Sequence, residues 1–210
     1  GLRVTDMETI KIVENILSNE INSKIVNDIK ISGGKAEGFS GNKNRLIEAK
    51  KLKIFAKESD SKIEKILDLG FVGEPTNINT AIIEESIKKG NVPVISPLGI
   101  DKNNNTFNIN ADTAAGYIAG SLKADKLLLL TDVAGILDEN QNLISSLNFQ
   151  EAKSIINEKY ILGGMKPKIS TCINSISKGV RQATILDGRI SHALILELFT
   201  EHGIGTQIYS

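Results

Sequence analysis

The sequence has few of the residues from which metal sites, disulfides and thiol nucleophiles are built. Its 210 residues include a single cysteine, Cys172, and two histidines, His192 and His202, without companions at ligand spacing. This scarcity argues against a disulfide framework, a zinc site and a Cys-His catalytic pair. We therefore expect no dedicated metal ligands and a reducing, cytoplasmic location.

An excess of charge of one sign is also lacking. The 25 Lys and Arg residues balance the 25 Asp and Glu residues, so no basic field exists to hold a nucleic acid. No apolar run approaches the roughly 18 residues that a membrane span needs, and no leader pattern precedes the first predicted helix. We expect neither a nucleic-acid partner nor a membrane association.

Three familiar catalytic motifs are missing too. The chain has no GxxxxGK[ST], no GxSxG and no GxGxxG after a strand, so a P-loop enzyme, an α/β-hydrolase and a dinucleotide-binding domain are unsupported. Arginine is rare: the arginines are Arg3, Arg45, Arg181 and Arg189. The few planar guanidinium groups are therefore candidates for binding carboxylates or phosphates.

The first half of the chain predicts two amphipathic helices, a strand, an exposed hairpin and a third helix. Thr5 and Glu8 match a capping box before a helix, and Gly33 and Gly34 end the second helix, which begins near Ile21. Alternating charged and apolar residues between about 35 and 69 predict the strand and hairpin. Asn79 is the expected cap of a helix that reaches about residue 89.

From about residue 92 strands alternate with helices, which predicts a parallel α/β layer with helices on both faces. The run KLLLLTD predicts a strand covered on both faces. Further helices are expected over about 149–160 and 167–181. Ligands of such sheets bind beyond the carboxyl ends of the strands, so the segments SPLG, NINAD, TDVAG and LDG are where we expect a site.

The segment GGMKPK, residues 163–168, has the composition of an anion site. Pro167 suits the first turn of a helix, and Lys166 and Lys168 would add cations to the unpaired N–H groups there. The alternative is a pair of solvated lysines, which is an unfavourable choice at the positive end of a helix. Arg3, just before the first helix, is either a further anion ligand or an exposed arginine.

Two other segments are less specific. In NINAD, Asp112 would be a good helix cap, and one interpretation is that it has no further role. The other is that it belongs to a site, because Asn108 and Asn110 point the same way beyond their strand. In TDVAG, Thr131, Asp132 and Gly135 could line a nucleotide pocket, but an ordinary βα turn uses the same residue types.

Taken together, GLRVTD, SGGKAEGFSG, DLGFVGEP, VPVISPLGI, FNINADTAA, LLLLTDVAGILD, ILGGMKPK, DGRISHALILELFT and GIGTQI occur in the order and near the spacing typical of acetylglutamate kinases. The chain is therefore similar to this branch of the amino acid kinase family over essentially its whole length. The resemblance implies a three-layer αβα sandwich with a mainly parallel open sheet. It also implies transfer of the ATP γ-phosphoryl group to the side-chain carboxylate of N-acetyl-L-glutamate, in arginine biosynthesis.

The resemblance also implies roles for individual residues. Lys168 would contact the transferring phosphoryl group, and Asp112 would organise the catalytic lysines. Arg3 and Asn108 would bind acetylglutamate, and a hairpin over about 51–67 would form part of its lid. The implied ATP site comprises Thr131, Asp132, Gly135, Gly164 and Met165, with Mg²⁺ bound through the phosphates. The implied lobes are 1–95 for acetylglutamate and 96–210 for ATP.

The sequence departs from the family pattern in several places. The Lys-x-Gly-Gly turn and the His-Gly-Gly loop of the family are not present, so we expect these residues to lack part of the first lobe, including central strands. Glu37 stands where the strand is usually apolar, and Lys166 stands where an apolar residue is usual. The missing glycine loop keeps an alternative open, a non-catalytic chain that binds ATP or arginine and acts in regulation or assembly.

The C-terminal segment resembles that of the forms that arginine inhibits. The resemblance places an arginine ligand near Glu197 and Gly203 and implies a homo-oligomer, either a dimer or a hexamer. A nitrogen-signalling protein is a candidate partner in photosynthetic organisms. The abundance of Asn, Ile and Lys is typical of AT-rich genomes, including those of plastids, so the plastid stroma is the alternative location.

Overall fold

The computed structural model describes residues 4–57, 64–200 and 203–210, and the side chains among them except at 54–57 and 64–67. The chain forms two compact units, Leu2–Ala114 and Ala115–Ser210. Both units combine helices with sheets that contain parallel strand pairs, so the predicted α/β class is confirmed. The lobes expected at 1–95 and 96–210 were defined by their substrates, and that functional division stays a prediction.

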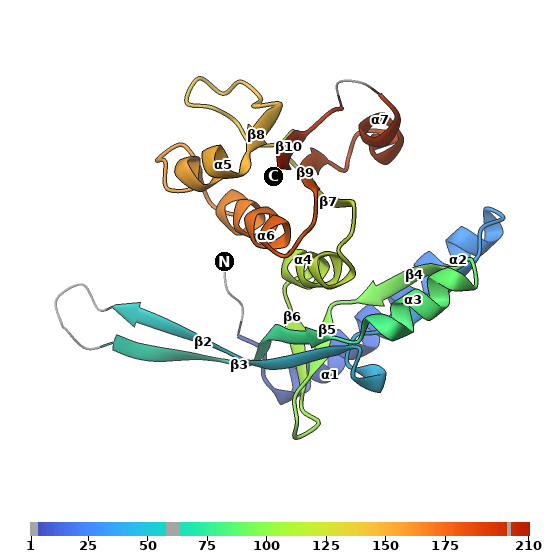
Figure 1. Cartoon of the computed structure of the whole chain (residues 1–210). Helices are drawn as coiled ribbons and strands as arrows, with labels where there is room; N and C mark the ends of the chain where they lie inside the picture. Colours follow the sequence, from blue (N-terminus) through green and yellow to red (C-terminus); the bar gives the residue numbers. More distant parts are fainter. Residues whose placement is uncertain (1–3, 58–63, 201–202) are drawn as a thin grey trace. The chain divides into compact units, whose positions relative to one another are not determined.

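The first unit begins with a long helical segment. Helix α1 (Met7–Glu14) continues as a π-helical stretch (Asn15–Ile21) into α2 (Asn22–Ile31) (Figure 1). The capping box predicted at Thr5 is wrong, because the carboxylate of Asp6 accepts the capping bond from the N–H of Thr9 at 2.7 Å. Thr5 is instead 2% exposed and pairs through its backbone with Gly70. The end of α2 is as predicted: Gly33 follows it with φ +84°, a conformation that glycine adopts without strain.

Strand β1 (Ala36–Ser40) runs parallel to β4 (Val92–Ser96), and α2 packs on both strands. Helix α3 (Thr80–Lys88) packs on β4 and follows Asn79, as predicted, although the Asn79 side chain makes no capping hydrogen bond. The charged Glu37 of β1 is half-buried, and its carboxylate accepts hydrogen bonds from Ser86 Oγ at 2.7 Å and Asn91 Nδ2 at 3.2 Å. These two donors explain how a strand position that is usually apolar holds a carboxylate.

Four strands of the first unit hydrogen-bond in a closed ring, in the order β2, β3, β6 and β5. The predicted hairpin is formed by β2 (Ile47–Lys57) and β3 (Glu64–Ile78), which pair antiparallel and extend as a long ribbon (Figure 1). Residues 58–63, within the predicted lid, lie outside the described residues. Strand β5 (Leu98–Ile100) and β6 (Thr106–Ile109) form a second, short hairpin.

The second unit is built on a four-stranded sheet with the order β7-β9-β10-β8. Its strands are β7 (Lys126–Thr131), β8 (Ser146–Asn148), β9 (Gln182–Asp187) and β10 (Thr206–Tyr209). The sheet is mainly parallel, as expected: β7 and β9, and β8 and β10, are parallel, and β10 runs antiparallel to β9. The leucines of β7 are less covered than expected: Leu127 and Leu129 are buried, but Leu130 is 46% exposed.

The helices of this unit are α4 (Ala111–Leu122), which begins in the first unit, α5 (Phe149–Ile155), α6 (Met165–Ser177) and α7 (Ala193–Phe199). Helix α6 packs on β7, β9 and β10 and buries Ile169, Cys172 and Ile176 in the core. Helix α5 is shorter than the predicted 149–160. None of the described helices is long and apolar enough to cross a membrane.

Two threonines occupy neighbouring strands in the core of this sheet, with different surroundings. The hydroxyl of Thr206 accepts a hydrogen bond from the N–H of Ile136 at 2.8 Å and donates to the carbonyl of Ile144 at 2.6 Å. The hydroxyl of Thr184, in β9, is buried without a hydrogen-bond partner among the described residues. Both side chains are at most 1% exposed. The Thr206 hydroxyl therefore ties the segment 136–144 to the sheet, whereas the Thr184 hydroxyl forms no such link.

We expect Thr206→Val to lower the free energy of unfolding by roughly 2–4 kcal/mol, because two buried backbone groups lose their partner. Thr184→Val is the matched control. It removes a hydroxyl that is already unsatisfied, so it should lower the free energy of unfolding by less than about 1 kcal/mol, or raise it. Urea unfolding followed by circular dichroism checks both, and equal losses would contradict the assignment.

Candidate functional site

The carboxyl ends of two parallel strands meet at one edge of the second unit. Thr131, the last residue of β7, lies in register with Asp187, the last residue of β9. The N–H of Gly188 then donates to the carbonyl of Thr131 at 2.8 Å, which holds the two strand ends together. The segments TDVAG and LDG therefore begin side by side, as expected for ligand-binding loops of a parallel pair.

A cavity of about 340 Å³ opens beside the end of β7. It is lined by Thr131, Asp132, Val133, Gly135, Leu137, Gln141, Tyr160, Ile161, Leu162, Gly164, Met165 and Lys168. Six of these are the residues that the sequence analysis associated with ATP and the transferring phosphoryl group. The structure therefore brings together, in one pocket, side chains that lie up to 37 positions apart in the chain, from Thr131 to Lys168.

The start of α6 forms one wall of this pocket. Gly164 is the N-terminal cap residue, and the helix begins at Met165, two residues before the predicted start at Pro167. Pro167 is tolerated in this first turn because its missing N–H would have had no partner within the helix. Free N–H groups at a helix start attract anions, and the half-buried Lys168 adds a cation on the pocket side.

The two glycines before α6 leave room for a ligand. A Cβ atom on Gly163 or Gly164 would meet no heavy atom within 4 Å, so neither glycine is required by close packing. Gly163 has φ +50°, whereas Gly164 has φ −69°, which any residue adopts. Lys166 is exposed and is not among the pocket residues, so only Lys168 of the predicted pair lines the cavity.

An ion pair stands at the end of β9. The Nε and Nη2 atoms of Arg189 donate to the two carboxylate oxygens of Asp187 at 2.9 and 2.7 Å, and the Arg189 backbone N–H donates as well. These bonds lower the pKa of Asp187 to about 2 from the ordinary value of 3.8. The carboxylates of Asp187 and, more weakly, Asp132 raise the pKa of Arg189. Arg189 thus connects the β9 end electrostatically to the pocket residue Asp132.

Arg189→Ala should raise the pKa of Asp187 towards 3.8, because its principal hydrogen-bond donor is lost. In the parent chain the pair stabilises the fold above about pH 4, and this contribution disappears as the pH falls through about 2. The variant should lose that part of the acid dependence of stability. Carbon-13 NMR titration of the carboxyl group checks the shift, and an unchanged pKa would contradict it. Arg181→Ala, which breaks a distant surface pair with Asp125, is the control.

The remaining predicted substrate residues belong to the first unit. Asn108 is half-buried in β6, in register with Leu98 and Val72. Asp112 lies in the first turn of α4, but the prediction that it caps this helix is wrong. Asn110 is the cap: its side-chain oxygen accepts from the N–H of Thr113 at 3.0 Å. Arg3 lies outside the described residues.

Glu197 and Gly203, the predicted arginine ligands, lie next to each other in the second unit. Glu197 of α7 is 7% exposed, and one carboxylate oxygen accepts from the N–H of Ile204 at 2.9 Å. A Cβ atom on Gly203 would approach that same oxygen to 2.6 Å. The structure therefore places a buried carboxylate beside a glycine with φ +59°, a conformation that favours glycine, and a Cβ atom there would displace the carboxylate.

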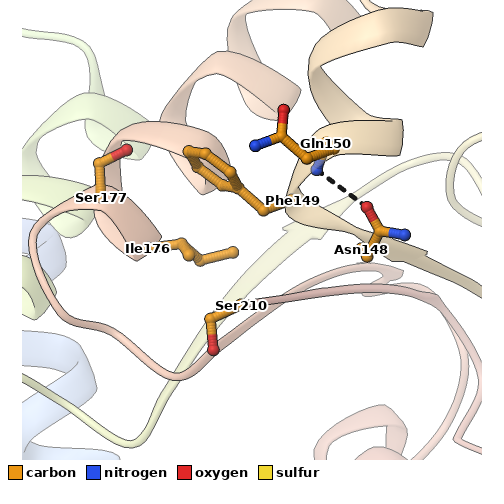
Figure 2. Close-up of a pocket in the computed structure, with 6 residues that line it drawn as sticks. All are labelled: Asn148, Phe149, Gln150, Ile176, Ser177 and Ser210. Atoms are coloured by element: carbon orange, nitrogen blue, oxygen red, sulfur yellow. Dashed lines mark hydrogen bonds between the residues drawn. The ribbon is translucent and has the colours of Figure 1, made fainter.

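A larger cavity, of about 610 Å³, lies over Phe149 and Ile176 (Figure 2). None of the six residues that line it has a charged side chain. Asn148 is engaged in the capping box of α5, where it accepts from the N–H groups of Gln150 and Glu151. Its lining has no cationic side chain, and the helix start that it contains, that of α5, is already capped by Asn148, so the larger volume does not make it the better anion site.

The sequence alone did not point to six residues of the pocket: Val133, Leu137, Gln141, Tyr160, the buried Ile161 and Leu162. Gln141 lies in a turn that begins at Asp138, and Leu137 directly precedes that turn. Val133 lies in the TDVAG loop, and Tyr160, Ile161 and Leu162 lie in the segment before α6. A signal was present in the sequence: the spacing Asp-x-Asn-x-Asn of this turn occurs twice, at 101–105 and at 138–142. Apolar residues such as Tyr160 carry no chemical signature and are found only from the structure.

The α/β fold of the second unit carries a pocket at its strand ends, lined by a lysine and by the start of a helix. The model of the amino acid kinase family matches residues 2–187, and the chain belongs to that family. More particularly, it is 50% identical over 208 residues to the acetylglutamate kinase of Rhodospirillum centenum and 49% identical over 208 residues to that of Solidesulfovibrio magneticus. These alignments cover 99% of this chain and 68% and 70% of the two relatives.

Solved structures agree with this assignment. The N-acetylglutamate synthase of Neisseria gonorrhoeae, complexed with coenzyme A and N-acetyl-glutamate, superposes with a TM-score of 0.84 at 27% identity. The alignment covers 100% of this chain and 46% of that one, so the chain spans about half the length of that enzyme. A carbamate kinase from Giardia superposes with a TM-score of 0.66 at 14% identity, over 95% of this chain and 71% of that one, which supports the fold alone.

Proposed function

We propose that this chain provides the ATP site and the acetylglutamate residues of an enzyme that phosphorylates the side-chain carboxylate of N-acetyl-L-glutamate. The observation that supports the proposal most directly is the pocket of the second unit, whose lining combines Lys168, the start of α6 and the end of β7. The acetylglutamate kinases that the chain resembles over 99% of its length supply the choice of acceptor.

The chemistry suits a site of this kind. The acceptor carboxylate is already ionised, so no strong general base is needed. The difficulty is to bring two anions into line and to stabilise the charge on the equatorial oxygens of the transferring group. Lysine ammonium groups and helix-start N–H groups provide that stabilisation, and one such donor contributes on the order of 3–4 kcal/mol to transition-state binding.

Other residues take roles in the same reaction. Asn108 and Arg3 bind acetylglutamate, Asp112 organises the catalytic lysines, and the β2–β3 hairpin forms part of the acetylglutamate lid. Thr131, Asp132, Gly135, Gly164 and Met165 contact ATP. The protein acts as a homo-oligomer, and a nitrogen-signalling protein is a candidate partner.

The enzyme uses ATP together with Mg²⁺. Among the described residues no group of three or more His, Cys, Asp and Glu side chains is arranged to hold a metal ion. We propose that the ion is held through the phosphates, because Mg²⁺ in kinase sites is bound largely by substrate oxygens and water. When bound, the ion neutralises charge on the phosphate oxygens. Lys168 and the first N–H groups of α6 orient the same oxygens.

Lys168→Ala should lower the rate of acyl phosphate formation about 100- to 1,000-fold, because a donor to the transferring group is lost. Lys166→Ala is the matched control: it removes an equal charge two residues away, from a side chain outside the pocket, and should keep the rate within about 3-fold. Hydroxylamine trapping with ATP, Mg²⁺ and N-acetyl-L-glutamate measures both. Equal effects of the two substitutions would contradict the role of Lys168. A purified protein that neither forms acyl phosphate nor binds ATP would contradict the proposed function.

Arginine is the proposed feedback inhibitor, bound by the carboxylate of Glu197 beside Gly203. Glu197→Gln should raise the arginine concentration for half-inhibition by at least about 10-fold, because the amide still accepts from Ile204 but no longer attracts a guanidinium group. The exposed Glu139→Gln is the control. Inhibition curves at fixed substrate measure the effect, and an unchanged curve for Glu197→Gln would refute this location.

A further inference from the structure

The chain builds the same turn twice. In the hairpin of the first unit, the carboxylate of Asp101 accepts from the backbone N–H groups of Asn103 and Asn105 and from the Asn105 side chain. In the second unit, Asp138 accepts from the corresponding groups of Asn140 and Asn142. The flanking pairs, Ile100 with Thr106 and Leu137 with Leu143, complete the correspondence.

The two turns differ at the residue that carries a positive φ. Asn104 in the first turn and Gln141 in the second both have φ +65°. Asparagine adopts this left-handed conformation several-fold more readily than most residues, and glycine adopts it without strain. The first turn therefore has a residue that suits its backbone. The second turn has glutamine, a longer amide that the local backbone does not favour.

The disfavoured residue lines the ATP pocket. Gln141 and Leu137, on the same turn, belong to the lining of the 340 Å³ cavity, together with the apolar Tyr160 and Leu162. The turn is fixed from both sides, since Asp138 holds its backbone N–H groups and Thr206 holds its flanks at Ile136 and Ile144. Strained residues that are held by their surroundings in this way occur preferentially at binding sites.

We propose that the side-chain amide of Gln141 binds the base of the nucleotide and makes the pocket selective for adenine. The proposal rests on the function proposed above, because it takes the ligand of this cavity to be a nucleoside triphosphate. Lys168 and the start of α6 belong to the lining and would meet the phosphates. The same lining contains the apolar Leu137, Tyr160 and Leu162, which offer surface for a planar base, and Gln141, which is its one side chain with an amide group.

The amide has the chemistry for this selection. Adenine presents the N7 acceptor and the N6 amino donor on one edge, and a glutamine amide pairs with both at once. Guanine presents two acceptors, N7 and O6, on the same edge, so the amide satisfies one and leaves its own oxygen unpaired. Asp138 acts as a positioning residue here, because it holds the backbone from which Gln141 extends.

The test compares three nucleotides on the purified protein by calorimetry: ATP, GTP and 7-deaza-ATP, which lacks the N7 acceptor. The parent chain should bind ATP about 5- to 10-fold more tightly than either analogue, which corresponds to the lower end of discrimination by a bidentate amide. Gln141→Ala, Gln141→Gly and Gln141→Asn should bind the three nucleotides with dissociation constants within about 2-fold of one another. The last two substitutions should also leave the melting temperature unchanged or raise it, because they suit the positive φ.

Asn104→Gln is the matched control, since it places the same strained glutamine in the turn outside the pocket. It should lower the melting temperature and leave the preference for ATP intact. Equal affinity of the parent chain for ATP and 7-deaza-ATP, or a preference that survives in Gln141→Ala, would overturn the inference while the proposed function stands. Failure of the parent chain to bind any of the three nucleotides would overturn the proposed function and, with it, this inference.

Discussion

The hydroxyl of Thr206 connects the core of the second unit to its pocket. It accepts from Ile136 and donates to Ile144, so one side chain of a buried strand holds both ends of the segment that carries Leu137 and Gln141. Gly135 has to be small for this contact, because a Cβ atom there would lie 2.6 Å from the same oxygen. The glycine of TDVAG thus has a packing role besides lining the cavity. The Thr206 hydroxyl satisfies the N–H of Ile136 and the carbonyl of Ile144, and the N–H of Ile144 donates to the carbonyl of Ile136, so the ends of this pocket segment are held to the sheet and to each other.

The start of α6, another part of the pocket lining, contributes positive potential. The start of α6 already presents N–H groups without intrahelical partners, and a lysine in that first turn is unfavourable unless an anion is bound. Lys168 stands in this position and faces the cavity, whereas Lys166 is exposed to solvent. A helix start with a lysine in its first turn presents positive potential to the cavity, which suits phosphate binding. The lysine in its lining distinguishes the smaller cavity from the larger one of Figure 2, whose lining has no charged side chain.

Much of this arrangement was predictable, and the errors have physical reasons. The α/β class, the hairpin, the end of α2 and the gathering of Thr131, Asp132, Gly164 and Lys168 followed from periodicity, glycine signals, the rule for strand ends and the family resemblance. The helix caps were harder, because Thr5 and Asp6, like Asn110 and Asp112, are candidates within two residues of each other with similar propensity. Tertiary contacts decided between them: Thr5 is buried in a backbone bridge to Gly70, which leaves Asp6 to cap α1. The direction of β10 depends on long-range pairing that local patterns do not contain.

The paired turns show a more general way to find functional residues from a single chain. Where the same backbone is built twice in one protein, the residue types that differ between the copies reflect surroundings and ligands, because the local conformational preference is the same in both. Asparagine at residue 104 follows that preference, and glutamine at residue 141 departs from it in the lining of a cavity that also contains a lysine and several apolar side chains. Departures from local preference that tertiary contacts hold in place are expected at functional sites. The internal comparison therefore points to Gln141 from this chain alone, without an alignment of relatives.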